Sequence, residues 1–178
     1  MRLAVFMSSP RKGGNSDKLA EAFIAGAKAG GHQTTTITIR ECTINGCLGC
    51  EYCYDHSGSC IQQDDMQNVY TILENSDVVV FATPIYYQGF PAQLKAVVDR
   101  LYVSENRDFP IIGSVLLATY ATEGHFMAEQ TLSYYRSLAC YHEWKNFGEI
   151  TVCGLDEKND IVGNPALIAA YELGKGLG

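Results

Sequence analysis

The sequence predicts an α/β fold in which helices cover both faces of a parallel sheet. Short β-branched or apolar runs alternate along the 178-residue chain with segments whose apolar residues recur at helical spacing. Most of the short runs are apolar throughout, which is typical of strands buried on both faces. Hydrophobic residues make up 47% of the chain and charged residues 19%, as in globular proteins. We expect one domain over residues 1–178.

The first strand is expected at "LAVFM", residues 3–7, which is a continuous apolar run. A helix is expected over residues 16–29, because apolar residues recur there three and four positions apart and a pair of glycines then gives a stop signal. The β-branched run "TTTITI", residues 34–39, is expected to form the second strand.

Residues 42–60 show no sustained period and are predicted to form a loop. The next helix is expected to be capped by Asp64 and Asp65, because an apolar stripe at helical spacing follows over residues 66–73. The run "DVVVFA", residues 77–82, is the expected third strand.

An amphipathic helix around residues 94–101 is expected after the loop "TPIYYQGFP". Near its end, the adjacent residues Asp99 and Arg100 are interpreted as a structural pair or a helix-end contact. The run "IIGSVLLAT", residues 111–119, is the expected fourth strand.

A helix over residues 125–141 and a strand at "EITVC", residues 149–153, complete the alternation. The last helix has clear start and stop signals, with Asn164 as a cap, Pro165 at the first helical position and Gly174 past the end. A chain of strands that alternate with helices predicts a parallel sheet, whose ligands bind outside the carboxyl ends of the strands. The segments after the first, third and fourth strands are therefore the candidate site.

The net charge of -7 and the absence of a basic run argue against nucleic-acid binding. No apolar stretch approaches the roughly 18–20 residues that a membrane-spanning helix needs. The N-terminus also lacks the pattern of a signal peptide, because the basic "PRK" follows the short apolar segment. We expect a cytoplasmic protein that binds neither nucleic acid nor a membrane.

The segment "SSPRKGGNS", residues 8–16, joins the first strand to the first helix and favours phosphate binding. Two glycines allow close approach of a ligand to the backbone, and the helix directs its free N–H groups and positive dipole end at the loop. The segment fits neither the P-loop pattern nor G-x-G-x-x-G, so a single phosphate is favoured over a triphosphate or a dinucleotide. An ordinary helix cap after a polar turn is the alternative.

Aromatic and small polar side chains follow the third and fourth strands. Tyr86 and Tyr87 are placed at the carboxyl edge of the sheet, where a flat heteroaromatic ligand would fit, although local packing or a dimer contact would also explain them. The segment "ATYATEGH" offers a second wall, at the end of which His125 could contact the ring or donate a proton.

Together, "SSPRKGGNS", "TPIYYQGFPAQLKAVVDRL" and "ATYATEG" resemble the NADPH-dependent FMN reductase branch of the flavodoxin-like flavoproteins. The resemblance runs over nearly the whole chain and implies a five-stranded parallel sheet of order 2-1-3-4-5 that binds FMN. By this resemblance the FMN phosphate would be held by Ser9, Arg11, Asn15 and Ser16. The isoalloxazine would be lined by Pro84, Ile85, Tyr86, Tyr87, Thr119, Tyr120, Ala121, Thr122 and Gly124.

Five of the seven cysteines lie within residues 42–60. The run C-x2-C-x2-C is how a tight loop wraps an iron–sulfur cluster, and a fourth cysteine follows nearby. The set also resembles the compact motif of the iron–sulfur flavoproteins, in which a [4Fe–4S] cluster exchanges electrons with FMN. Reduced structural thiols and a zinc site are the alternatives, and the compact spacing is unlike most zinc sites. The four candidate ligands are Cys47, Cys50, Cys53 and Cys60.

We therefore expect an FMN-dependent oxidoreductase that passes electrons from NAD(P)H to a small acceptor such as a quinone or a nitro compound. The flavin would carry the chemistry, so no catalytic side chain is assigned. One alternative is an electron carrier that uses the [4Fe–4S] cluster and FMN and is fed by ferredoxin. Another is a flavin-fold binding or signalling module without catalysis. The resemblance also implies a homodimer or homotetramer.

Overall fold

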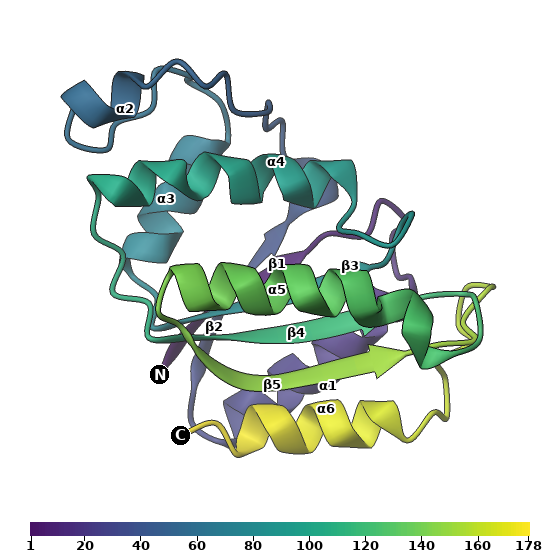
Figure 1. Ribbon diagram of the computed structural model, residues 1–178. Coiled ribbons are helices and arrows are strands. Elements are labelled where there is room, and N and C mark those ends of the chain that lie inside the picture. Colours follow the sequence, from purple (N-terminus) through teal and green to yellow (C-terminus); the bar gives the residue numbers. More distant parts are fainter.

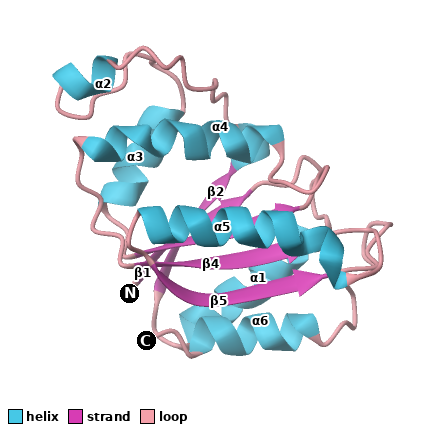
Figure 2. Cartoon of the chain, in the orientation of Figure 1, coloured by secondary structure: helices cyan, strands magenta, loops and turns pink.

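The computed structural model describes residues 1–178 apart from the side chain of His125. Its core is a five-stranded sheet in the order β2-β1-β3-β4-β5, in which every neighbouring pair is parallel (Figures 1 and 2). The predicted fold class and strand order are thus confirmed. The strands are β1 (Arg2–Met7), β2 (Gln33–Thr38), β3 (Val78–Pro84), β4 (Gly113–Thr119) and β5 (Lys145–Val152).

Helices cover both faces of the sheet, with α3, α4 and α5 on one face and α1 and α6 on the other (Figure 1). Alternate residues of each strand therefore enter different cores: Phe81 packs under α3 to α5, whereas Val80 packs under α1 and α6. No described helix is both long and apolar enough to cross a bilayer. The α-helices are α1 (Asn15–Ala29), α2 (Tyr52–Asp55), α3 (Met66–Glu74), α4 (Ala92–Arg100), α5 (Glu129–Tyr141) and α6 (Ala166–Lys175), and the 3₁₀ turns are η1 (Ile39–Glu41), η2 (Leu101–Glu105) and η3 (His125–Ala128).

Several predicted elements differ from the structure. Strand β4 begins at Gly113 and not at residue 111. Of the two expected caps of α3, Asp64 accepts a hydrogen bond from the Met66 N–H at 3.1 Å, whereas Asp65 is the N-cap without a side-chain hydrogen bond to the helix. Strand β5 begins at Lys145, earlier than the predicted residue 149, because its polar start pairs with β4 on one side at the edge of the sheet. The predicted loop over residues 42–60 contains the short helix α2, which lies beyond α3 and α4 as seen from the sheet (Figure 1).

The last helix also differs from its prediction at both ends. At its start, the side chain of Asn164 accepts a hydrogen bond from the backbone N–H of Ala166 at 2.9 Å, as the expected cap would. Pro165, expected at the first helical position, is instead the N-cap, and α6 begins at Ala166. Gly174, however, lies inside the helix, and Gly176 is the C-cap. The reason is tertiary, since a Cβ at Gly174 would lie 2.3 Å from the carbonyl oxygen of Phe23 in α1. This glycine therefore permits close helix packing and does not end the helix.

Gly26 makes the reciprocal contact, and Gly26→Ala is expected to destabilise the fold. An added Cβ would lie 1.9 Å from the carbonyl oxygen of Tyr171, so α1 and α6 would have to separate. We expect the free energy of unfolding, measured in urea, to fall by about 1–3 kcal/mol, although alanine favours a helix more than glycine does. Gly46→Ala is the matched control, because an added Cβ there meets no atom within 4 Å. Equal stabilities of the two variants would contradict this account.

Candidate functional site

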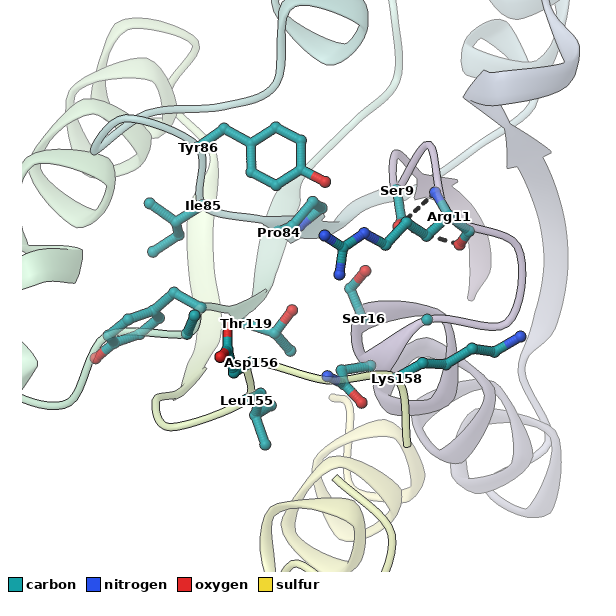
Figure 3. Close-up of a pocket in the computed structure, with 14 residues that line it drawn as sticks. Ser9, Arg11, Ser16, Pro84, Ile85, Tyr86, Thr119, Leu155, Asp156 and Lys158 are labelled. Atoms are coloured by element: carbon teal, nitrogen blue, oxygen red, sulfur yellow. Dashed lines mark hydrogen bonds between the residues drawn. The ribbon is translucent and has the colours of Figure 1, made fainter. Parts of the chain in front are cut away.

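The loops at the carboxyl ends of β1, β3, β4 and β5 line one cleft (Figure 3). Such an edge is where ligands of open α/β sheets bind. The structure brings together there ten of the predicted residues: Ser9, Arg11, Asn15, Ser16, Pro84, Ile85, Tyr86, Thr119, Tyr120 and Ala121. Gly14, one of the two glycines expected to allow close approach of a ligand, also lines the cleft, and three lining residues were not predicted, namely Leu155, Asp156 and Lys158.

The loop between β1 and α1 is a tight turn that exposes the first turn of the helix to the cleft. The Ser9 hydroxyl donates a hydrogen bond to the Arg11 carbonyl oxygen and accepts one from the Arg11 N–H, both at 3.2 Å (Figure 3). Gly14 is the N-cap of α1, and a Cβ there would lie 3.3 Å from both the Ser9 hydroxyl and the Arg11 carbonyl oxygen. The turn is therefore shaped around a bare backbone, as an anion cradle requires.

An ion pair between the buried Asp17 and the partly buried Arg40 supports this loop. The carboxylate of Asp17 accepts hydrogen bonds from the Gly13 N–H at 2.8 Å and from the Arg40 guanidinium at 3.0 Å. Arg40 also donates to the carbonyl oxygen of Ser9 at 3.3 Å. The backbone of the loop is thus fixed before any ligand binds. Because Arg40 lies far from the loop in sequence, no local pattern indicated this contact.

Asn15 connects the cradle to the loop that follows β5. Its side-chain amide donates to the carbonyl oxygen of Glu157 at 2.9 Å, and its side-chain oxygen accepts from the Ile161 N–H at 3.4 Å. This contact holds the Lys158 ammonium 3.6 Å from the position that a Cβ would take at Gly13. The sequence signal that could have indicated this loop is its position after the last strand, at the carboxyl edge of the sheet.

Tyr120 lies between this cleft and a second one. It lines both of them, and among the described atoms its buried hydroxyl has no hydrogen-bond partner. Burial raises the pKa of the Tyr120 hydroxyl, and the neighbouring Cys153 thiol raises it further. The hydroxyl is therefore a protonated donor at the junction of the clefts, where a bound ligand could accept its hydrogen bond.

The second cleft contains two more of the predicted residues. Tyr87, whose side chain is fully exposed, and Thr122 line it. Gly124 lines neither cleft, and the predicted contact of His125 falls on a side chain outside the described residues. The complete second lining is Ile85, Tyr87, Gln88, Tyr120, Ala121, Thr122 and Met127.

The four predicted cysteine ligands line a separate cavity, which shares no lining residue with the first cleft. Burial raises the pKa of the Cys53 thiol, and the other three cysteines raise it further, because each would place a like charge nearby. The cavity has a volume of about 30 Å³, so the cysteine segment has to open outward to admit a cluster. Among the described side chains, no three His, Cys, Asp or Glu residues are arranged to hold a single metal ion.

Comparison with known proteins gives a family and several relatives. A family model described as NADPH-dependent FMN reductase matches residues 1–153. The iron–sulfur flavoprotein of Methanosarcina thermophila is 30% identical over 170 residues, which cover 93% of this chain and 84% of the relative. An iron–sulfur flavoprotein of Archaeoglobus fulgidus is 36% identical over 101 residues, which cover 57% of this chain and about half (46%) of that relative.

Solved structures share the fold at low sequence identity. An NAD(P)H:quinone oxidoreductase from Methanothermobacter marburgensis superposes with a TM-score of 0.82 at 19% identity and covers 99% of this chain and 96% of its own. An azoreductase from Bacillus anthracis superposes with a TM-score of 0.75 at 18% identity and covers 98% of this chain and 99% of its own.

Proposed function

The chain belongs to the NADPH-dependent FMN reductase family and is an FMN-dependent oxidoreductase, and from this premise we propose that it transfers electrons from NAD(P)H to a small acceptor such as a quinone or a nitro compound. The observation that carries the proposal is the cleft at the carboxyl edge of the sheet. There an anion cradle, an aromatic wall and a buried hydroxyl that has no hydrogen-bond partner among the described side chains line one space. When bound, FMN would supply the acceptance and release of hydride or electrons.

The cradle would hold the FMN phosphate. The first turn of α1 offers backbone N–H groups and the positive end of the helix dipole, and the buried hydroxyl of Ser16 lies in this turn. Arg11 and Lys158 add positive charge from two loops. In this proposal Asn15 acts on the phosphate through the position of Lys158, because its side-chain amide is hydrogen-bonded to the loop after β5.

The wall after β3 and β4 would hold the flavin ring. Pro84 is the last residue of β3, and Ile85 follows it. The backbone N–H of Ile85 donates to the carbonyl oxygen of Thr119 at 2.9 Å, so the loops after β3 and β4 form one surface. Tyr86 lies above Pro84 at the mouth of the cleft (Figure 3). The second cleft, beyond Tyr120, would leave room beside the ring for NAD(P)H and then the acceptor.

The test is a titration of the apoprotein with FMN, followed by NADH and NADPH oxidation with a quinone and with a nitro compound. We expect quenching of flavin fluorescence at a 1:1 ratio and turnover that depends on FMN. Failure to bind FMN, or FMN binding without nucleotide oxidation by either donor, would overturn the proposal.

Lys158→Met is expected to weaken FMN binding without affecting the fold. Methionine keeps an unbranched stem but removes the charge near the cradle, so we expect the Kd for FMN to rise about 5–10-fold at low salt and less at high salt. Lys28→Met is the matched control, because Lys28 is exposed at the far end of α1. The proposed role of Lys158 is wrong if both variants bind FMN as the unmodified protein does.

A second candidate function is electron transfer through a [4Fe–4S] cluster together with FMN, with ferredoxin as the donor. Two observations support it: four cysteines line one cavity, and relatives of this chain are named iron–sulfur flavoproteins. The cluster would be held by the thiolates of Cys47, Cys50, Cys53 and Cys60 and would supply one-electron chemistry.

Anaerobic purification and reconstitution with iron and sulfide test this second function. Four iron atoms per chain and a broad absorbance near the flavin bands would support it. An iron-free yellow protein with full NAD(P)H turnover would eliminate it and leave the first proposal intact.

We further propose that the chain acts in the cytoplasm as one domain and forms a homodimer or homotetramer. The exposed rings of Tyr87 and Phe126 offer apolar surface for such an assembly. Light scattering of the FMN-loaded protein tests the assembly, and a monomeric mass would contradict it.

A further inference from the structure

We propose that Arg100 is a positioning residue for the cluster: it clamps both ends of the cysteine segment and presents an N–H donor and a positive charge to the ligand cavity. This inference rests on the second candidate function. It concerns the effect of the Arg100 guanidinium on a cluster that the four cysteines would hold.

Arg100 holds the chain at both ends of the cysteine segment. Arg100 is the last residue of α4, and its side chain is only 1% exposed. One guanidinium nitrogen, Nη1, donates to the carbonyl oxygen of Asn45 at 3.1 Å and to a carboxylate oxygen of Asp64 at 2.8 Å. The other, Nη2, donates to the second carboxylate oxygen at 3.1 Å. Asn45 precedes the four cysteines and Asp64 follows them, so one buried side chain fixes where the segment leaves and rejoins the fold.

Arg100 also carries a hydrogen-bond donor that no described atom accepts. The Nε–H of Arg100 is buried and has no hydrogen-bond partner among the described atoms. A buried donor without a partner is costly and rare, and it calls for an acceptor that completes the site. Arg100 also lines the cavity that the cysteines Cys47, Cys50, Cys53 and Cys60 line. A ligating thiolate is the acceptor that this cavity offers.

Tyr70 holds the backbone of Arg100 at the wall of the same cavity. Tyr70 lines this cavity, and its hydroxyl donates to the backbone carbonyl oxygen of Arg100 at 3.0 Å. Both the backbone and the side chain of Arg100 are therefore fixed by hydrogen bonds at the wall that Cys60 also lines.

The expected consequence is electrostatic. Reduction adds negative charge to a cluster, and a fixed cation with an N–H donor at a ligand sulfur stabilises that charge. Arg100 would therefore raise the reduction potential as well as hold the ligands in place. A purely structural residue would alter cluster content, but its replacement would have no reason to lower the potential as the loss of an N–H donor at a ligand sulfur would.

Arg100→Lys is the primary test, and Arg107→Lys is the matched control. Lysine keeps a charge for Asp64 but loses the Nε–H and the planar fork. Arg107 packs over the Tyr70 ring, with its guanidinium carbon 4.9 Å from the ring centroid, and pairs with Glu74 without lining the cavity. Each variant is reconstituted anaerobically, and its iron content, FMN affinity and cluster midpoint potential are measured.

We expect Arg100→Lys to bind FMN normally, to hold less than half of the iron, and to have a cluster that is about tenfold harder to reduce, about 59 mV for one electron. Arg107→Lys should match the unmodified protein. Asp64→Asn should shift the midpoint potential in the opposite direction. A neutral amide no longer offsets the positive charge of Arg100, so the cluster should be easier to reduce.

The outcomes separate the two ideas. An unmodified protein that takes up no iron eliminates the cluster and this inference with it. A loaded protein whose midpoint potential is unchanged by Arg100→Lys overturns the role of Arg100 and leaves the cluster standing. If Arg100→Lys does not fold, as judged by loss of FMN binding, Asp64→Asn decides, and an unchanged or lower potential in that variant refutes the inference.

Discussion

Ser16→Asp is expected to abolish FMN binding while leaving the apoprotein folded. Ser16 lies in the first turn of α1 and lines the cleft where the FMN phosphate is proposed to bind. A carboxylate there would occupy the positive end of the helix dipole and repel the phosphate. The positive end of the helix dipole also favours a carboxylate in the first turn, so α1 should still form in this variant. We expect the Kd for FMN to rise at least 100-fold, about 2.7 kcal/mol, in a fluorescence titration.

Ser16→Ala is the matched control for this charge. It removes one hydroxyl and adds no charge, so a loss of about 10-fold is expected. Thermal unfolding of both variants without FMN checks that the fold is intact. If Ser16→Asp binds FMN within threefold of the unmodified protein, the phosphate does not bind at this helix end.

Asp64→Ala is expected to have the largest effect on stability. The ion pair between Asp64 and Arg100 is buried, with side chains 8% and 1% exposed. Removal of the carboxylate leaves a cation inside the protein, and the hydrogen bonds that it accepts from the N–H groups of Asn45 and Met66 are lost as well. We expect the free energy of unfolding, measured in urea, to fall by about 3–5 kcal/mol.

Asp99→Ala in the same region is the matched control. Asp99 pairs with Lys95 on the exposed face of α4, where both side chains are more than 40% exposed, so a loss of about 0.3–0.5 kcal/mol is expected. The double variant Asp64→Ala/Arg100→Met should recover part of the stability lost in Asp64→Ala, because no unpaired cation remains. Equal losses in Asp64→Ala and Asp99→Ala would show that the buried pair contributes little.

Acid unfolding gives a second measurement of the same ion pair. Burial alone would raise the pKa of Asp64, but the hydrogen bonds from Arg100, Asn45 and Met66 outweigh it, and the net pKa is lowered from 3.8. The stability that this carboxylate contributes is therefore complete above the unfolded-state pKa near 3.8 and is lost as the pH falls through the lower folded-state value. In Asp64→Ala this part of the acid dependence should be absent.

Much of the fold follows from local patterns in the sequence. Continuous apolar runs gave β1, β3 and β4, because a strand covered on both faces must be apolar along its whole length. The right-handed connection between parallel strands then limits the possible strand arrangements. Ligands of such sheets bind at the carboxyl edge. This is why ten predicted residues from three loops line one cleft, although their contacts with FMN stay a prediction.

Pairings between distant segments could not be predicted in this way. Arg100 was expected to pair with its neighbour Asp99 or to make a helix-end contact, whereas the structure pairs it with Asp64. Lys158 joins the cleft only because Asn15 hydrogen-bonds the loop after β5.

By itself, the sequence determined the order of the elements, the class of sheet and the edge where a phosphate-bearing ligand would bind, since each depends on residues that are close together along the chain. The tertiary structure alone decided which charges are buried together, which loop completes the cradle and why Gly174 lies within α6. These outcomes depend on how helices and loops pack across the sheet, and a local pattern carries no information about a partner tens of residues away.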